Sequence, residues 1–227
     1  IRTHLGEYSS DLVVSTMDIM LTYRKLLQNQ EAPEKILRQE RSTSALIFYW
    51  GIKKQFGQLG LHNILFSNDY PGEFKALSEG NEAFTDPTVY ISITSKDVPD
   101  DAPEGCENWY VMVNAPFDRG QDWNKMINDY RSAIIKKINF QFHVKIEDLI
   151  EVEDFLSPPE IESRTSSFGG SLYGNSSNNR FSAFFRHANE SKKIKGLYFC
   201  GGSVHPGGGI PLCLLSAKIL SDLCPNP

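Results

Sequence analysis

Apolar positions near the end of the chain change from a strand-like run to a helical period. Residues 197–200 form a short apolar run bounded by glycines, which predicts a buried strand. Pro211 then stands at the first position of a predicted helix, where its missing N–H costs nothing. One face of that helix carries Leu212, Leu215, Ser216, Ile219, Leu220 and Leu223. The pattern predicts a strand, a turn and an amphipathic helix.

The middle of the chain has short apolar runs with a period of two. Val89, Ile91 and Ile93 alternate with polar or aromatic neighbours, as in a half-buried strand. A 122–142 helix is predicted from its apolar stripe and from Asp122, which can cap it. Further strands are predicted at residues 11–16, 44–52, 62–66, 109–114 and 149–155. This succession favours an antiparallel or mixed sheet with flanking helices, a fold of the α+β or α/β class.

Composition and charge exclude several classes of function but say little about the fold. The 227 residues are 40% hydrophobic and 22% charged, as in ordinary globular proteins. A net charge of −5 argues against a general nucleic-acid binder. No apolar run approaches the roughly 18–20 residues that cross a bilayer. The four cysteines lack Cys-x-x-Cys spacing and the five histidines form no His-x-x-x-His pair, so no metal site is predicted and a reducing cytosol is favoured.

The turn between the predicted C-terminal strand and helix holds five glycines in residues 201–209. Glycine lets the backbone approach a ligand closely and adopt positive φ. The N–H groups at a helix start favour an anion or a ring that becomes anionic. On the glycines alone, a crossover that packs a helix tightly on a sheet explains the composition equally well.

The order of residues in this stretch is Leu197-Tyr-Phe-Cys-Gly-Gly-Ser-Val-His-Pro-Gly-Gly-Gly-Ile-Pro211. It resembles the C-terminal signature of the bacterial-type phytoene desaturases, a carotenoid-handling branch of the flavin amine oxidase superfamily. In that family the pattern wraps the flavin end of FAD. Residues 170–174, Gly-x-x-Tyr-Gly, are similar to a family element close to the flavin and the substrate passage. Leu212 and Cys213 stand where the family often has a small residue, which leaves the shape of the substrate tunnel open.

The resemblance implies the site residues. The cofactor-binding residues would be Gly201, Gly202, Ser203, His205, Gly208, Gly209, Ile210 and Pro211. The substrate-binding residues would be Tyr90, Trp109, Tyr173 and Gly174. No catalytic side chain is expected, because a flavin, and not a side chain, accepts the hydride. His62 is more simply a hydrogen-bonded residue at a strand start than a general base.

The resemblance also implies the domain organisation. No Gly-x-Gly-x-x-Gly follows a predicted strand, so we expect the C-terminal part of a longer flavoprotein, with an incomplete FAD-binding, Rossmann-like domain. Residues 1–28 would belong to that domain. Residues 29–155 would form the substrate-binding domain, and residues 156–227 the flavin-proximal loop and the last part of the FAD-binding domain.

The expected function is that of an FAD-dependent oxidoreductase that removes hydride from a long apolar, carotenoid-like polyene. This stretch alone would be inactive and would bind FAD weakly or not at all. Which polyene reacts, and whether by desaturation, isomerisation or saturation, stays open, as do the final electron acceptor and the oligomeric state. We expect a cytoplasmic protein with peripheral membrane contact, for which Phe181, Phe184 and Phe185 are local candidates. The alternative is a non-catalytic module that binds an apolar ligand or a partner and retains the fold without cofactor.

Overall fold

The computed structural model describes residues 1–79, 82–176 and 185–224. The chain divides into two compact units, one formed by Ile1–Ser42 with Glu162–Pro227 and the other by Thr43–Ile161. The predicted domain assignment had different bounds. Residues 29–42, which we placed in the substrate-binding domain, lie in the first unit, where Leu37 packs against Ile19 and Phe199.

The Thr43–Ile161 unit is built on an antiparallel sheet of five strands. The strands are β4 (Ser44–Ile52), β5 (His62–Leu65), β6 (Val89–Ser92), β7 (Glu107–Ala115) and β8 (Ile150–Leu156). They lie side by side in the order β5-β6-β7-β4-β8, and every pairing is antiparallel. The prediction of an antiparallel or mixed sheet is therefore confirmed in its antiparallel form, and all five predicted strands of this segment are present.

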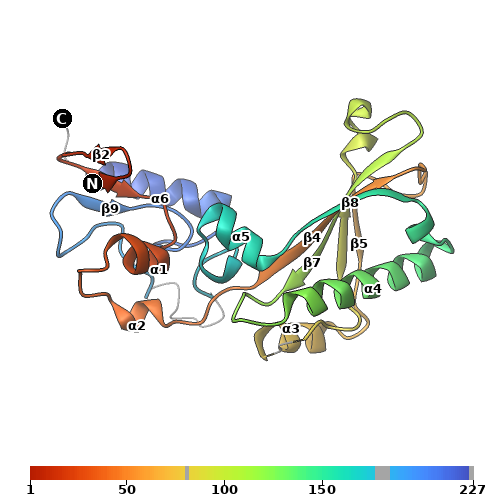
Figure 1. Ribbon diagram of the computed structural model, residues 1–227, viewed down its shortest axis with the longest axis horizontal. Coiled ribbons are helices and arrows are strands. Elements are labelled where there is room, and N and C mark those ends of the chain that lie inside the picture. The colour runs from red at the N-terminus through yellow and green to blue at the C-terminus, as the bar shows by residue number, and fades with distance from the viewer. Residues whose placement is uncertain (80–81, 177–184, 225–227) are drawn as a thin grey trace. The chain divides into compact units, whose positions relative to one another are not determined.

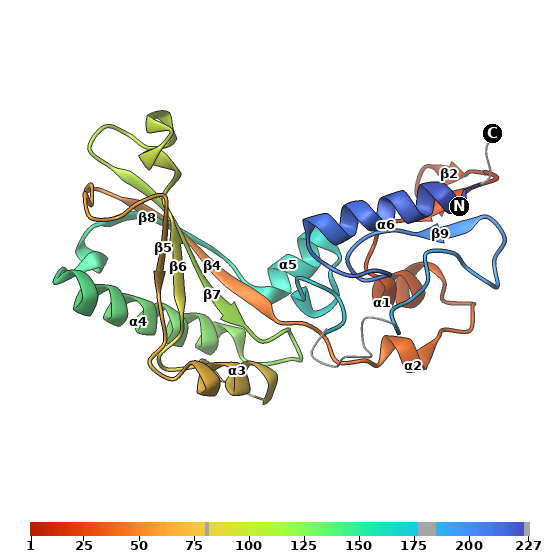
Figure 2. The same ribbon diagram turned by 180° about the vertical axis from the view of Figure 1, so that it is seen from behind.

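One face of this sheet is covered by α4 (Trp123–Phe142), as Figures 1 and 2 show. The side chain of Asp122 accepts a hydrogen bond from the N–H of Lys125, so the predicted cap is confirmed. Tyr130, Ile134 and Ile138 of the predicted stripe are buried against the sheet. The opposing sheet residues are Leu46, Phe48, Trp50, Ile52, Val89, Ile91, Trp109, Val111, Val113 and Ala115. The core of this unit therefore lies between the sheet and α4.

Shorter elements complete this unit. α3 (Tyr70–Glu79) is tied to the start of β6 by its buried Glu73, whose carboxylate accepts from the N–H and hydroxyl of Thr88. The 3₁₀ turns are η2 (Thr94–Lys96), η3 (Pro99–Asp101) and η4 (Ile146–Asp148). α5 (Pro158–Thr165) contains the sequence boundary to the other unit.

The other unit holds a parallel pair of strands, β3 (Val13–Ser15) and β9 (Leu197–Phe199). β1 (Arg2–Thr3) and β2 (Gly6–Glu7) form a hairpin before it. α1 (Ile19–Leu21) continues directly as a π-helical turn, η1 (Thr22–Leu26), and is followed by α2 (Glu34–Leu37). The 3₁₀ turn η5 (Phe168–Gly170) precedes the glycine-containing loop, and α6 (Ile210–Leu223) comes last. Ile19, Leu37 and Phe199 are among the residues of its small core.

The predicted C-terminal helix is present, but its apolar stripe is not buried. Leu212, Leu215 and Leu223 are between 40% and 44% exposed, whereas Ser216 is fully buried. The buried Ser216 hydroxyl joins the side chain of Asn189 and the N–H of Gly201. On the predicted face, Ser216 is buried and Ile219 and Leu220 are half-buried. The periodicity was therefore sufficient to predict the helix, and its predicted face is covered only in part.

Candidate functional site

The glycine turn, residues 201–209, connects β9 to α6 and folds back on itself. Gly201, Gly207 and Gly209 adopt φ values of 125°, 141° and 97°, a region that favours glycine. A methyl group added at Gly202 would lie 3.2 Å from the Cα of Gly208, so the two limbs of the turn touch through their backbones. The turn therefore needs glycine for its own shape before any ligand is considered.

The loop of Tyr173 and Gly174 packs directly on this turn. A methyl group added at Gly208 would lie 2.6 Å from the Cα of Tyr173. One added at Gly174, where φ is 67°, would lie 2.7 Å from the Cα of Ser203. Ser42 holds the loop from the other side, since its hydroxyl accepts from the N–H of Tyr173 at 2.9 Å. Two segments that we assigned to cofactor and substrate are thus brought together by the fold.

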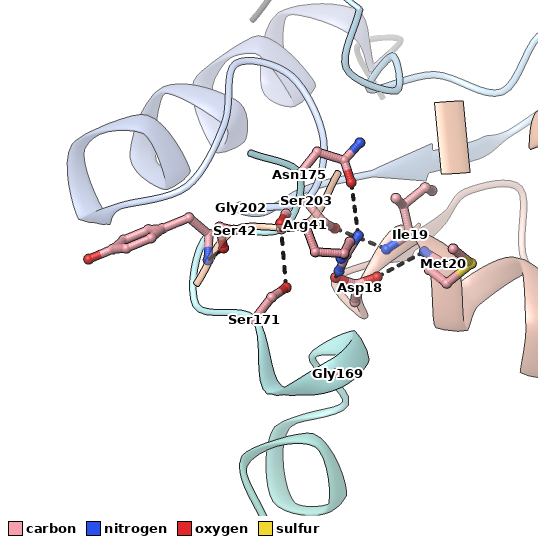
Figure 3. Close-up of polar contacts among 12 residues, drawn as sticks. Asp18, Ile19, Met20, Arg41, Ser42, Gly169, Ser171, Asn175, Gly202 and Ser203 are labelled. Carbon is pink, nitrogen blue, oxygen red and sulfur yellow. Dashed lines mark hydrogen bonds and ion pairs between the residues drawn. The ribbon is translucent and has the colours of Figure 1, made fainter. Parts of the chain in front are cut away.

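A buried ion pair lies beside these loops and is shown in Figure 3. The guanidinium of Arg41 pairs with the carboxylate of Asp18, and their side chains are only 4% and 5% exposed. Asp18 also caps α1 by accepting from the N–H of Met20, and Arg41 donates to the side-chain oxygen of Asn175 at 2.9 Å. The network therefore joins the start of α1, the segment after α2 and the loop that follows Gly174.

A second guanidinium, that of Arg186, lies next to this network. It donates to the backbone oxygens of Asn175 at 2.8 Å and of Gly202 at 3.3 Å. Burial and the nearby charge of Arg41 lower the pKa of Arg186. Two guanidinium groups and the Asp18 carboxylate thus flank the glycine turn, so positive charge predominates among these three side chains.

The predicted cofactor-binding residues of the turn differ in their contacts and exposure. The hydroxyl of Ser203 accepts from the N–H of Ile19 at 2.9 Å, so it fixes the turn to α1. His205 keeps an exposed side chain, while its backbone oxygen accepts from Asn189. Pro211 lies in the first turn of α6, as predicted from its missing N–H. Gly209 and Ile210 line a pocket at the start of that helix.

This pocket has a volume of about 520 Å³ and lies at the N-terminus of α6. Its lining is almost wholly apolar and comes from Leu172, Tyr173, Gly209, Ile210, Cys213 and Leu214. No side chain caps the helix start, and a side chain at Gly209 would meet nothing within 4 Å. An open, apolar space at a helix N-terminus fits a flat ring system that carries electronegative atoms on one edge. The residues present therefore fit the flavin end of FAD.

The other predicted substrate residues are separated by the sheet. Tyr90 lies on the sheet face opposite α4, where its hydroxyl and Nδ1 of His62 are 2.7 Å apart. Trp109 points the other way, is buried in the core beneath α4 and donates to Glu107 at 2.8 Å. The alternation of β7 puts Trp109 out of reach of a ligand on the Tyr90 face, so we withdraw Trp109 as a substrate residue. His62 begins β5, and its role as a hydrogen-bonded strand-start residue is confirmed.

The remaining predictions concern membrane contact, metal binding and a membrane span, and part of the residues involved lie outside those that the structure describes. Phe181 and Phe184 lie outside the residues that the structure describes, and Phe185 is exposed. Within the described ranges, no three His, Cys, Asp or Glu side chains lie close enough to hold a metal ion. None of the described helices is both long and apolar enough to cross a bilayer.

Sequence reasoning missed the residues that hold the turn in place. Asp18 was available as a helix cap from its position before α1, but Arg41, Asn175 and Arg186 belong to no periodic pattern. They meet only because the fold brings segments 134 residues apart into contact. Along the chain, β9 is followed by the glycine turn and α6, and β3 pairs parallel with β9.

Comparison with known proteins identifies the relatives of this chain. No protein-family model matches it. It is 57% identical to a 1-hydroxycarotenoid 3,4-desaturase of Flavobacterium sp. (strain P99-3), over 100% of this chain and 46% of the relative. A 4,4'-diaponeurosporene oxygenase of Staphylococcus haemolyticus is 31% identical, over 94% of this chain and 43% of the relative. A phytoene desaturase of Fusarium fujikuroi is 29% identical, over 97% and 42%.

The resemblance to the phytoene desaturase family is therefore confirmed, because the homologues are carotenoid desaturases and related oxygenases that match almost the whole chain. The chain spans less than half the length of these curated relatives. A solved oxidoreductase from Methanosarcina mazei matches 95% of this chain and 43% of its own, with a TM-score of 0.50 at 10% identity. That likeness supports the mixed α/β fold alone.

Proposed function

We propose that this chain is part of an FAD-dependent oxidoreductase that desaturates a long apolar polyene of the carotenoid type. The observation that carries the proposal is the apolar pocket at the N-terminus of α6, bounded by the glycine turn and by Tyr173. The names of the relatives support the polyene as substrate class. Desaturation removes a hydride and a proton from adjacent carbons, and FAD, when bound, supplies the acceptor for the hydride.

The residues that would hold the flavin end are those of the turn and the helix start. Gly209 would let the backbone approach the ring, because nothing lies within 4 Å of a methyl group there, and Ile210 would cover it from the pocket wall. Gly201, Gly202 and Gly208 would give the turn the shape that surrounds the ring. Ser203 would act indirectly, since its hydroxyl already accepts from Ile19. Tyr173 and Gly174 would close the pocket toward the substrate.

The charges around the turn would favour a ring that gains electrons. Arg41 and Arg186 outnumber Asp18 in the buried network. The N-terminus of α6 would add partial positive charge, because the first N–H groups of a helix have no partner within it. Fixed dipoles and charges in a water-poor site stabilise developing negative charge without reorganisation.

The remaining parts of the FAD site would lie on chain beyond this stretch. Parallel strands are normally buried on both faces, yet Val14 of β3 is exposed. The partial coverage of the relatives supports the same conclusion. We therefore expect full activity only from the natural protein that carries these residues.

The test is to purify that natural protein and measure its bound FAD, then add a polyene without oxygen. The proposal expects stoichiometric FAD, loss of the flavin absorption band and a polyene band shifted to longer wavelength. A protein that binds the polyene but contains no FAD would overturn the proposal and support the non-catalytic apolar-ligand module.

A matched pair of glycine variants tests the turn itself. Gly208→Ala places a methyl group 2.6 Å from the Cα of Tyr173, so bound FAD should fall at least tenfold as the turn shifts. Gly60→Ala is the control, because nothing lies within 4 Å of a methyl group there. Equal FAD content in the two variants would contradict the assignment of the turn.

A further inference from the structure

Among the strands that the structure describes, the five-stranded sheet ends in two edge strands, β5 and β8. An exposed edge strand can pair with another chain, and charged side chains and irregular pairing protect against this. β8 has both, since it contains Glu151, Glu153 and Asp154 and its pairing with β4 includes a register shift. β5 has neither, because it pairs with β6 without a shift and residues 55–68 contain no Asp, Glu, Lys or Arg.

The outer edge of β5 presents backbone groups that can bind a further strand. The backbone oxygen of Leu61 accepts from the N–H of Ile93 at 2.9 Å. Because alternate residues of an antiparallel pair exchange backbone hydrogen bonds, every second residue from Leu61 onward bonds to β6. His62 and Ile64 therefore direct their N–H and C=O groups to the outer edge, where no other described strand pairs with β5. Such an edge is a template for strand addition.

The side chains beside this edge are apolar and exposed. Ile64 is 51% exposed, Phe66 is 66% exposed, and Phe140 of α4 is 80% exposed. These three residues, with Leu65 and Ala133, form the apolar part of the lining of a groove of about 720 Å³. A strand added to the outer edge, about 4.8 Å from β5, would place its own side chains against Ile64 and Phe66. Burial of these two side chains favours the addition.

The geometry selects a second copy of this chain as the source of the added strand. A two-fold axis through the edge pairs β5 with its own copy in the antiparallel sense, as in every other pair of this sheet. With Ile64 opposite Ile64 of the second copy, His62 lies opposite Phe66, and no carboxylate, lysine or arginine meets its like. Two copies of β8 would instead oppose acidic residues. A bilayer would cover the apolar side chains but would leave the outward backbone groups without partners.

We propose that the outer edge of β5 pairs with the same edge of a second copy, so that the protein forms a two-fold symmetric dimer through one continuous antiparallel sheet. Ile64 lies at the two-fold axis, with His62 and Phe66 on either side of it. The inference goes beyond the proposed function, because it uses neither the glycine turn nor a cofactor.

The test measures self-association of the natural full-length protein by sedimentation velocity over a range of concentrations. The wild type should form a dimer. Ile64→Lys should raise the dissociation constant of that dimer at least about tenfold, because it opposes two like charges at the two-fold axis. The matched control is Val152→Lys, which changes a 67% exposed valine on the other edge strand and should leave the dissociation constant unchanged.

A crosslink and hydrogen exchange test the register of the two strands directly. In Ile64→Cys, the opposed residues would have Cα atoms about 5.5 Å apart, a separation that a disulfide spans. Oxidation should give a covalent dimer of this variant. Val152→Cys and the wild type, which has four free cysteines, are the controls and should give none. In the wild type, the N–H of Ile64 should exchange more slowly as the concentration rises through the dissociation constant.

A protein that stays monomeric over the whole concentration range overturns the inference. A dimer that Ile64→Lys leaves intact also overturns it, because its interface then lies elsewhere. So does an Ile64 N–H that is protected at every concentration in a monomer, because another segment of the natural protein then covers β5. Absence of FAD overturns the proposed function alone, since none of these measurements depends on the cofactor.

Discussion

Replacing Asp18 by asparagine removes one charge from the buried network beside the glycine turn. Asp18 has two roles there, as the partner of Arg41 and as the cap of α1. Asparagine caps a helix about as well as aspartate, so the N–H of Met20 keeps its acceptor. The substitution therefore isolates the effect of the charge.

The expected magnitude follows from burial. Both side chains of the pair are at most 5% exposed, so solvent does not replace the lost partner. Removing one member of a buried ion pair costs about 3–5 kcal/mol, mostly because the other charge stays buried and unpaired. The Asp18→Asn, Arg41→Met double variant should lose less than the single variant. It buries no isolated charge and leaves only the oxygen of Asn175 without its donor, at a cost of about 1–3 kcal/mol.

Hydrogen–deuterium exchange of the natural protein measures this locally. In Asp18→Asn, amides of residues 19–22 and 173–176 should exchange at least about a hundredfold faster, since about 1.4 kcal/mol corresponds to a factor of ten. Amides of β4 and α4 should keep their rates. Asp129→Asn is the control, because it breaks an exposed ion pair with Lys125 and should change no rate measurably.

The reasoning would be refuted by exchange within about threefold of the wild type in Asp18→Asn. It would also be refuted by a double variant that is less stable than either single one. Either result would mean that Arg41 finds another partner when Asp18 loses its charge, and that the network does not hold the turn.

Two further predictions concern buried ionisable groups. Burial lowers the pKa of His187, so below its ordinary value of 6.5 the unfolded chain takes up a proton that the folded chain does not. Stability should fall as pH drops from about 6.5, and His187→Gln should flatten this dependence in urea unfolding measured from pH 5 to 8. Glu107→Gln should destabilise the sheet unit by about 3 kcal/mol, because it removes the charge that pairs with Lys96. A lower urea midpoint by tryptophan fluorescence checks this, and an unchanged midpoint would show that Lys96 reaches solvent instead.

Local sequence patterns predicted correctly those features that depend on residues within a single strand or helix. The period of two in β6 assigned the faces correctly, with Val89 and Ile91 inward and Tyr90 outward. Asp122 was predicted as a cap and is one. The same logic was only partly right for α6, where Ser216 of the predicted face is buried while Leu212 and Leu215 of that face are exposed.

No local sequence pattern predicted the buried network of Asp18, Arg41 and Asn175. Arg41 and Asn175 are 134 residues apart, and each looks like an ordinary polar residue in its own segment. Trp109 is an error of the opposite kind. It was assigned to substrate binding because it is an aromatic residue in the predicted substrate-binding domain, but its position in the strand places it in the core. The sequence around a residue predicts whether it lies in a strand, a helix or a loop. Which residues it contacts depends on how the helices and strands pack against one another.

The sequence by itself determined the strands, the long helix, the glycine turn and the relationship to carotenoid desaturases, because these depend on short periods and on an ordered motif of adjacent residues. Only the tertiary structure decided that Tyr173 and Gly174 close on the turn, that Arg41 and Arg186 flank it, and that Tyr49, Tyr90 and Tyr110 form one surface. The physical reason is that such contacts depend on strand register and long-range packing. Both are set by the burial of whole elements against one another and not by the residues next to them in sequence.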